Sequence, residues 1–271
     1  ANYSFMFFVG IDLAWSEKNK SGVAILKGDE NMAELVSADV ISSDNEIIDF
    51  IKKTLKNNNA LIAIDAPLII PNNEGRRDAE ALVGYLFRKY HAGAHPSNRK
   101  RLSQWSGKIR GEELSKKLEK EGFIHDPSIK QFEKSRKFFE VYPHPSMVVL
   151  FEMDKILEYK SKPHRDYAFR WDEFEKYRMH LKGLANAKPA LQLPEKLFQQ
   201  SMSSLKAKKL KDYEDLLDSV FCAYIGYYCW AKPGKCMVLG DMKQGYIMTP
   251  VFDFMKRQLA EKHAQKELSS F

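Results

Sequence analysis

The chain has 271 residues, of which 43 are Lys or Arg and 36 are Asp or Glu, giving a formal net charge of +7. Hydrophobic residues make up 44% and charged residues 29%, which excludes collagen-like, low-complexity and largely disordered chains. The length corresponds to one large domain or to one domain with a sizeable insertion. No stretch approaches the roughly 18 uncharged apolar residues that a membrane helix needs, so we expect no membrane partner.

Strand and helix patterns alternate through the first third of the chain. We expect three strands, a helix and a fourth strand, in this order, at residues 5–13, 21–26, 33–41, 43–55 and 60–65. The first strand opens the chain without a preceding basic segment, which favours a buried strand over a signal peptide. The three cysteines are too few for a disulfide framework, so we expect reduced thiols and a cytoplasmic location.

Beyond residue 71 the sequence becomes more polar and irregular. We expect further elements at residues 76–90 (helix), 112–121 (helix), 137–142 (strand), 147–151 (start of a helix), 155–200 (charged amphipathic helices), 211–230 (apolar helix), 237–240 and 245–248 (a strand pair), and 251–267 (helix). We interpret residues 1–271 as a single domain with insertions at about 71–136 and 155–210.

Carboxylates stand at positions where a buried negative charge is costly unless it is paired, hydrogen-bonded or bound to a metal. Asp12 and Asp65 each end a predicted strand, and Glu140 lies within a later one. Asp215 and Asp218, three residues apart, share one side of the apolar 211–230 helix. If the strands ending at Asp12 and Asp65 are neighbours, a helix packed across their carboxyl ends brings all four aspartates together.

Clustered carboxylates cannot all stay ionised unaided, and divalent cations relieve their repulsion. Hard oxygen ligands select Mg²⁺ or Mn²⁺, and two such ions about 3.5–4 Å apart can hydrolyse a phosphodiester. Taken singly, Asp12 and Asp65 are also typical of turn or loop-capping residues, and Asp215 of a solvated helix edge. Their combination, in this order and on these elements, favours a metal site.

These patterns resemble a known superfamily. The strand order, the Gly10-Ile11-Asp12 opening, the Asp65-Ala66-Pro67 strand end and the Asp-x-x-Asp helix resemble ribonuclease H-like proteins, closest to the Holliday-junction-resolvase type. More narrowly, the chain resembles the domain of unknown function 429 family, described as predicted ribonuclease H-like nucleases, at residues 9–15, 21–24, 64–67, 76–78, 140–145, 215–224 and 240–247. The resemblance implies an α/β fold with a ribonuclease H-like mixed five-stranded sheet flanked by helices, with helical insertions.

The resemblance also implies a site and an activity, that of a Mg²⁺- or Mn²⁺-dependent nuclease. Asp12, Asp65, Asp215 and Asp218 match the metal carboxylates of the resolvase pattern. Asp12, Asp65 and Asp218 are then expected to be catalytic, with Asp215 or Glu140 holding the second ion or its waters. Glu140 has no counterpart in the basic ribonuclease H set, and Ser219 stands where the resolvase pattern has Ala.

A basic segment provides candidate substrate contacts. Arg99, Lys100 and Arg101, near Trp105, could bind phosphates of a DNA or RNA partner, although a solvated basic loop has the same composition. His144, close to Glu140, could orient a phosphate or a metal-bound water, and a packed structural histidine is the alternative.

Two other functions remain open. Actin-like and sugar-kinase-type phosphotransferases that bind ATP also begin with a Gly-Ile-Asp strand, but this chain has only 14 glycines and no Gly-rich phosphate loop near Asp65. A non-catalytic nucleic-acid-binding module could keep the same fold and use only the basic segment.

Overall fold

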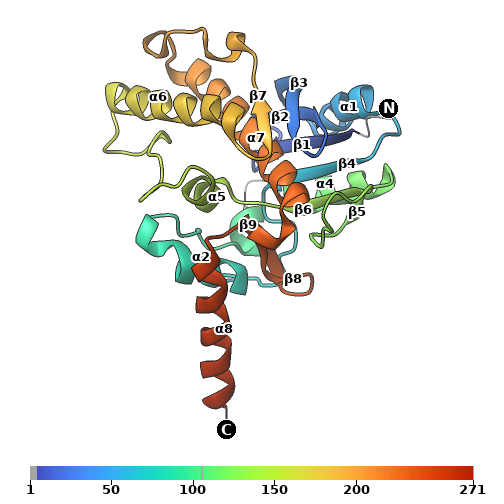
Figure 1. The fold of residues 1–271 in the computed structure, drawn as a ribbon, viewed down its shortest axis with the longest axis vertical. Coiled ribbons are helices and arrows are strands. Elements are labelled where there is room, and N and C mark those ends of the chain that lie inside the picture. Colours follow the sequence, from blue (N-terminus) through green and yellow to red (C-terminus); the bar gives the residue numbers. More distant parts are fainter. Residues whose placement is uncertain (1–4, 105, 271) are drawn as a thin grey trace.

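A seven-stranded mixed sheet forms the centre of the computed structural model, which describes residues 5–104 and 106–270 (Figure 1). Its strands are β1 (Met6–Asp12), β2 (Ser21–Gly28), β3 (Met32–Ile41), β4 (Ala60–Asp65), β5 (Ile124–His125), β6 (Arg136–Glu140) and β7 (Ala190–Gln192). Their spatial order is β5-β6-β4-β1-β2-β3-β7. β1, β2 and β3 form an antiparallel meander, and β4 and β6 continue the sheet parallel to β1.

The five strands β6-β4-β1-β2-β3 are compatible with the expected ribonuclease H-like α/β fold. The expectation of only five strands was wrong, because β7 extends the sheet beside β3 and β5 extends it beside β6. These added strands have three and two residues, too few for a periodic pattern to be visible in the sequence. The mixed α/β class itself is confirmed.

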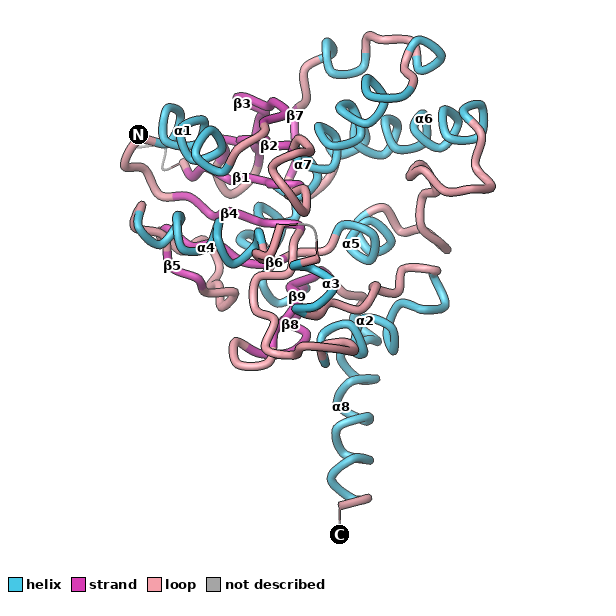
Figure 2. The backbone as a smooth tube through the Cα atoms, turned by 180° about the vertical axis from the view of Figure 1, so that it is seen from behind, coloured by secondary structure: helices cyan, strands magenta, loops and turns pink. Residues whose placement is uncertain are grey.

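Helices cover both faces of the sheet (Figures 1 and 2). They are α1 (Asp44–Leu55), α2 (Asp78–Phe87), α3 (Arg99–Ser103), α4 (Arg110–Lys120), α5 (Pro143–Leu150), α6 (Tyr167–Gly183), α7 (Ala207–Ala231) and α8 (Asp253–Leu268). Phe7, Val9 and Ile11 of β1 pack with α1 and α4, whereas Met6 and Phe8 pack in the core that contains α7. This coverage explains why β1 is a continuous apolar run.

Two glycines allow α7 to lie directly on the sheet. A Cβ atom at Gly10 would stand 2.0 Å from the carbonyl oxygen of Ser219 and 2.3 Å from the amide nitrogen of Ala223. A Cβ atom at Gly22 would stand 2.0 Å from the carbonyl oxygen of Asp215. Any side chain at these positions would lift the helix, so the glycines fix the height of the α7 carboxylates above the strand ends.

The second half of the chain departs from the prediction in two places. The helix expected to begin near residue 147 begins at Pro143, where a proline is favoured in the first turn because it lacks an N–H that would stay unpaired. Residues 155–200 were expected to be charged amphipathic helices, but α6 is the only α-helix there, accompanied by loops, short 3₁₀ turns and β7. Pro163, Pro189 and Pro194 interrupt helical hydrogen bonding in this stretch.

The remaining elements match the expectation to within a few residues, except for the five-residue helix α3, which was not expected. The strand pair is the hairpin of β8 (Cys236–Asp241) and β9 (Gly245–Pro250), which packs against α2 and α5. Figure 1 shows α8 projecting away from this end of the protein, with only Met255 and Leu259 buried. Among the described residues, none of the helices is both long and apolar enough to span a membrane.

Candidate functional site

The carboxyl ends of β1 and β4 place two aspartates side by side. Asp12 and Asp65 are direct partners in the parallel register of these strands, which confirms that the two strands are neighbours. Asp215 and Asp218 approach from α7, which packs on β1, β2 and β4. The structure therefore brings together the four aspartates that the sequence singled out.

The pKa shifts of the aspartates show that these side chains lie in a buried and negatively charged environment. Burial raises the pKa of the Asp12 carboxyl well above its usual value, and the nearby ammonium of Lys160 opposes that rise. Burial likewise raises the pKa of Asp65 to about 7 and that of Asp215 above its usual value. The negative charge of Asp218 raises the pKa values of Asp12 and Asp65 further. Burial and mutual repulsion therefore outweigh the attraction of the nearby lysines at these carboxyls.

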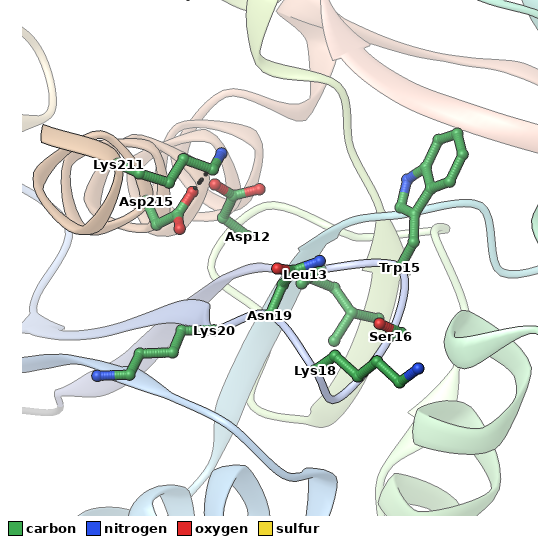
Figure 3. Close-up of a pocket in the computed structure, with 10 residues that line it drawn as sticks. Asp12, Leu13, Trp15, Ser16, Lys18, Asn19, Lys20, Lys211 and Asp215 are labelled. Atoms are coloured by element: carbon green, nitrogen blue, oxygen red, sulfur yellow. Dashed lines mark ion pairs between the residues drawn. The ribbon is translucent and has the colours of Figure 1, made fainter. Parts of the chain in front are cut away.

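Asp12 and Asp215 face each other at the edge of an open cleft (Figure 3). The cleft has a volume of about 700 Å³ and is also lined by Trp15, Lys18, Asn19, Lys20 and Lys211. The loop after β1 therefore carries lysines on the solvent side of the acidic group.

Asp218 differs from the other aspartates because it is fully buried and both of its oxygens are occupied. The phenol groups of Tyr159 and Tyr177 donate hydrogen bonds to Oδ1 at 2.7 and 2.9 Å. The Lys160 Nζ lies 2.5 Å from Oδ2. This hydrogen-bonded setting satisfies the Asp218 charge without a metal ion.

Two residues that the sequence reasoning missed complete the cluster. Glu214, buried on α7, lies 3.3 Å from Lys160 Nζ and 2.8 Å from Lys211 Nζ. Lys211 Nζ also lies 3.0 Å from Asp215 Oδ1, the ion pair drawn in Figure 3. Glu214 stands beside Asp215 in the sequence and could have been noticed for that reason. Lys160 lies in a segment without any motif, and no signal marked it.

The comparisons with known proteins identify the family. A family model described as "Protein of unknown function (DUF429)" matches residues 10–244. The chain belongs to the DUF429 family. The matched region contains Asp12, Asp65, Asp215 and Asp218, and it ends before α8. No curated protein and no solved structure gives a match.

In this DUF429 protein, Glu140 lies in a buried ion pair. Arg77 donates to both carboxylate oxygens of Glu140, at 2.9 and 2.7 Å, and the Leu68 N–H donates to Oε1 at 3.0 Å. Arg77 also donates to Glu80 at 2.8 Å. Burial raises the pKa of Glu140, and Arg77 opposes that rise. A metal or catalytic role for Glu140 stays a prediction, and the contacts show a carboxylate that holds Arg77.

The predicted substrate contacts are spread over different environments. Arg99 bonds to Glu112 at 2.5 Å and to the Ile70 carbonyl, and exposed Lys100 pairs with Glu74 at 3.5 Å. Arg101 places its guanidinium 5.3 Å from the ring centroid of Trp15, so it adjoins the cleft. Trp105 lies outside the described residues.

His144 lies on α5, next to Tyr159. Its ring is 6.0 Å from that of Tyr159, and its buried Nδ1 has no hydrogen-bond partner among the described residues. Burial lowers the pKa of His144 to about 3, and the charge of Lys160 adds to that effect. The imidazole is therefore neutral, and its role in phosphate binding stays a prediction.

A divalent cation fits part of this DUF429 site. Asp12, Asp65 and Asp215 supply oxygen donors that Mg²⁺ or Mn²⁺ accepts, and an ion would offset the repulsion between Asp12 and the other two carboxylates. Asp218 is a poorer ligand, because two phenols and one ammonium group already contact its oxygens. In residues 5–104 and 106–270, no three His, Cys, Asp or Glu side chains are already arranged as a ligand set. Binding an ion therefore requires some of these side chains to rotate.

Proposed function

We propose that this protein is a divalent-metal-dependent nuclease of the ribonuclease H-like type, which hydrolyses phosphodiester bonds in DNA or RNA. The observation that carries the proposal is the in-register pair of Asp12 and Asp65 with Asp215 facing it from α7, at a cleft of about 700 Å³. Carboxylates gathered at an open strand end, with raised pKa values, are typical of a cation-binding catalytic centre.

Asp12, Asp65 and Asp215 would hold Mg²⁺ or Mn²⁺. The ion would supply the charge that lowers the pKa of water and neutralises the phosphate. Glu214 is held by two lysines and takes no part in this set. In this proposal, hydrolysis would proceed without a covalent intermediate, because the metal ion would activate a water molecule as the nucleophile.

The rim of the cleft supports nucleic acid as the substrate class. Lys18 and Lys20 lie on the loop that follows Asp12, and they can pair with phosphates on either side of a scissile bond. Trp15 is 43% exposed and has the Arg101 guanidinium over its ring, an arrangement on which an unpaired base can stack. These features favour a polynucleotide over a free phosphate ester.

The experiment is a cleavage assay with DNA and RNA oligonucleotides, in Mn²⁺ and in EDTA. We expect wild-type protein to cleave only with the metal, and Asp12→Asn to lose about 100-fold or more of the rate. Asp49→Asn, at an exposed carboxylate on α1, is the matched control and should keep full activity. Equal cleavage by the wild type and Asp12→Asn would exclude the assignment.

A non-catalytic nucleic-acid-binding module is the second candidate, favoured by the ammonium of Lys160 among the carboxylates. In that case the protein would bind oligonucleotides and leave them intact under every metal condition. The same assay, with binding measured by fluorescence polarisation in parallel, separates the two functions.

A further inference from the structure

The loop between α5 and α6 delivers one lysine into the acidic cluster. The Lys160 Nζ lies 2.5 Å from Asp218 Oδ2 and 3.3 Å from Glu214 Oε2. Its charge also acts on Asp12 and Asp65. The ammonium group of Lys160 therefore lies among the carboxylates, at a place where the resemblance to ribonuclease H-like proteins implies a metal ion.

The backbone around Lys160 is fixed on both sides. The Tyr159 carbonyl accepts a hydrogen bond from Arg170 Nε at 2.9 Å, and the Lys160 carbonyl accepts one from Arg165 at 3.0 Å. One residue earlier, the Glu158 N–H donates to Glu173 at 2.8 Å. These contacts hold the loop so that the Lys160 side chain has little freedom to leave.

Lys211 provides a comparison within the same cluster. It contacts Glu214 and Asp215 at 2.8 and 3.0 Å, but its side chain is 60% exposed, against 29% for Lys160. An exposed lysine can swing into solvent when a metal ion arrives, at small cost. Lys160 is the lysine whose position depends on the surrounding structure.

Counting charges shows what the cluster still lacks. Its ion-paired acids are Glu214, Asp215 and Asp218, and Lys160, Lys211 and Arg170 balance them. Asp12 and Asp65 make no ion pair within 4.0 Å among the described residues. When both are ionised, two negative charges remain at the strand ends, which is the charge that one divalent cation neutralises.

We propose that Lys160 permanently takes the place of a second metal ion, so that the site accepts one divalent cation, on Asp12, Asp65 and Asp215. This inference rests on the proposed function and revises the expectation that Asp218 is a metal ligand. Lys160 acts here as a positioning residue, because it neutralises and orients Asp218 rather than touching the substrate.

The test is titration calorimetry with Mn²⁺ on the full chain. We expect one Mn²⁺ per wild-type chain. Lys160→Met should bind a second ion or bind the first about 10-fold or more tightly, because the competing ammonium is gone. Lys211→Met, which removes the same charge from the exposed position, should change the affinity less than about threefold, and Lys160→Arg should behave as wild type.

Each outcome decides a separate question. Two ions in the wild type, or unchanged binding by Lys160→Met, overturn the inference while leaving a metal-dependent nuclease intact. Binding by Lys160→Met but not by the wild type would show that Lys160 excludes every metal ion, which overturns both the one-ion site and metal dependence. Binding by none of the proteins overturns both.

Thermal unfolding covers the case in which Lys160→Met folds poorly. Without Lys160 the charge of Asp218 is buried and unpaired, so in EDTA the variant should unfold at a lower temperature than the wild type. Mn²⁺ should restore its stability more than it raises that of the wild type or of Lys211→Met. A loss of stability that Mn²⁺ does not repair overturns the inference.

Discussion

Gly10 on β1 lies so close to Ser219 on α7 that a Cβ atom at the glycine would stand 2.0 Å from the Ser219 carbonyl oxygen. Real Cβ atoms do not approach backbone oxygen this closely, so the strand and the helix can meet only if this residue has no side chain. Ser219 immediately follows Asp218 in the sequence. The contact therefore sets both the packing of the core and the position of the α7 carboxylates.

The Gly10→Ala variant is expected to be strongly destabilised. Backbone atoms cannot rotate away as a flexible side chain can, so the added methyl group must displace α7, at a cost of about 3 kcal/mol or more in the free energy of unfolding. Denaturation in urea measures this cost. Gly183→Ala is the control, since a Cβ atom at that end of α6 meets nothing within 4 Å. A variant of Gly10 as stable as wild type would show that α7 adjusts freely.

Stability in the absence of metal is expected to fall as the pH rises. Asp65 has a folded-state pKa of about 7 against a usual value of 3.8, so the folded protein holds this proton more tightly than the unfolded chain does. The stabilisation is complete below the unfolded pKa and is lost as the pH rises through about 7. Melting curves in EDTA from about pH 5 to about pH 8 should therefore show a decreasing melting temperature.

The Asp65→Asn variant tests the source of that slope. Asparagine does not titrate, so the decrease in melting temperature over the same pH range should become smaller. Mn²⁺ should also reduce it in the wild type, because a bound cation favours the ionised carboxylate. An equal slope in wild type and Asp65→Asn would assign the pH dependence to other groups.

The contrast between Asp12 and Lys160 shows how far the sequence could predict the site. Asp12 and Asp65 could be predicted because each ends an apolar strand, whereas the pairing of β1 with β4 that sets them side by side is given by the structure. Lys160 could not, because the interrupted stretch between α5 and α6 has no periodicity, and its position depends on contacts with Arg165 and Arg170.

The same limit applies to the fold. A run such as residues 60–65 is apolar along its whole length and bounded by turn residues, so β4 was predicted with the correct bounds. The edge strands β5 and β7 pair through only a few backbone hydrogen bonds and leave no side-chain pattern. The close approach at Gly10 also has no local signal, because it depends on a helix some 200 residues later.

The two phenols on Asp218 are expected to act as a unit. Tyr159 and Tyr177 donate to the same oxygen, at 2.7 and 2.9 Å, in a buried setting. Each Tyr→Phe variant should lose about 1–3 kcal/mol of stability, because one hydrogen bond to a buried carboxylate disappears. The double variant should deviate from the sum of the single ones, since both donors share one acceptor. Strict additivity in a double-mutant cycle would contradict this coupling.

Variants of the Arg77–Glu140 pair distinguish a structural role of Glu140 from a catalytic one. Both side chains are nearly fully buried, so Arg77→Met should destabilise the protein by about 3–5 kcal/mol by leaving an unpaired carboxylate. Lys100→Met, at an exposed pair with Glu74, should change stability by less than about 0.5 kcal/mol.

If Glu140 holds only Arg77, Glu140→Gln should lower the stability and leave the rate of cleavage by the folded fraction unchanged. A lower rate in fully folded Glu140→Gln would restore the catalytic prediction.

Trp15 provides the sharpest test of the substrate class. It is 43% exposed, it lines the cleft together with Asp12, and it also lines a smaller pocket of about 130 Å³ that contains Asp65 and Tyr142. A base stacked on the indole would place its phosphate near both aspartates, and such stacking is worth about 1–3 kcal/mol per base. Trp15→Ala should therefore weaken the binding of a single-stranded oligonucleotide by about 5- to 150-fold.

The measurement is fluorescence polarisation in an Asp12→Asn background with EDTA, so that no cleavage occurs. Trp15→Phe should retain most of the affinity, because a smaller aromatic ring still stacks. Phe169→Ala, which removes a comparably exposed ring from α6, is the control and should leave binding unchanged. Equal loss of affinity in Trp15→Ala and Phe169→Ala would mean that exposed aromatic surface binds the strand without a specific site. Tight binding by all variants would place the oligonucleotide on the lysines alone, and raising the salt concentration should then weaken every variant in parallel.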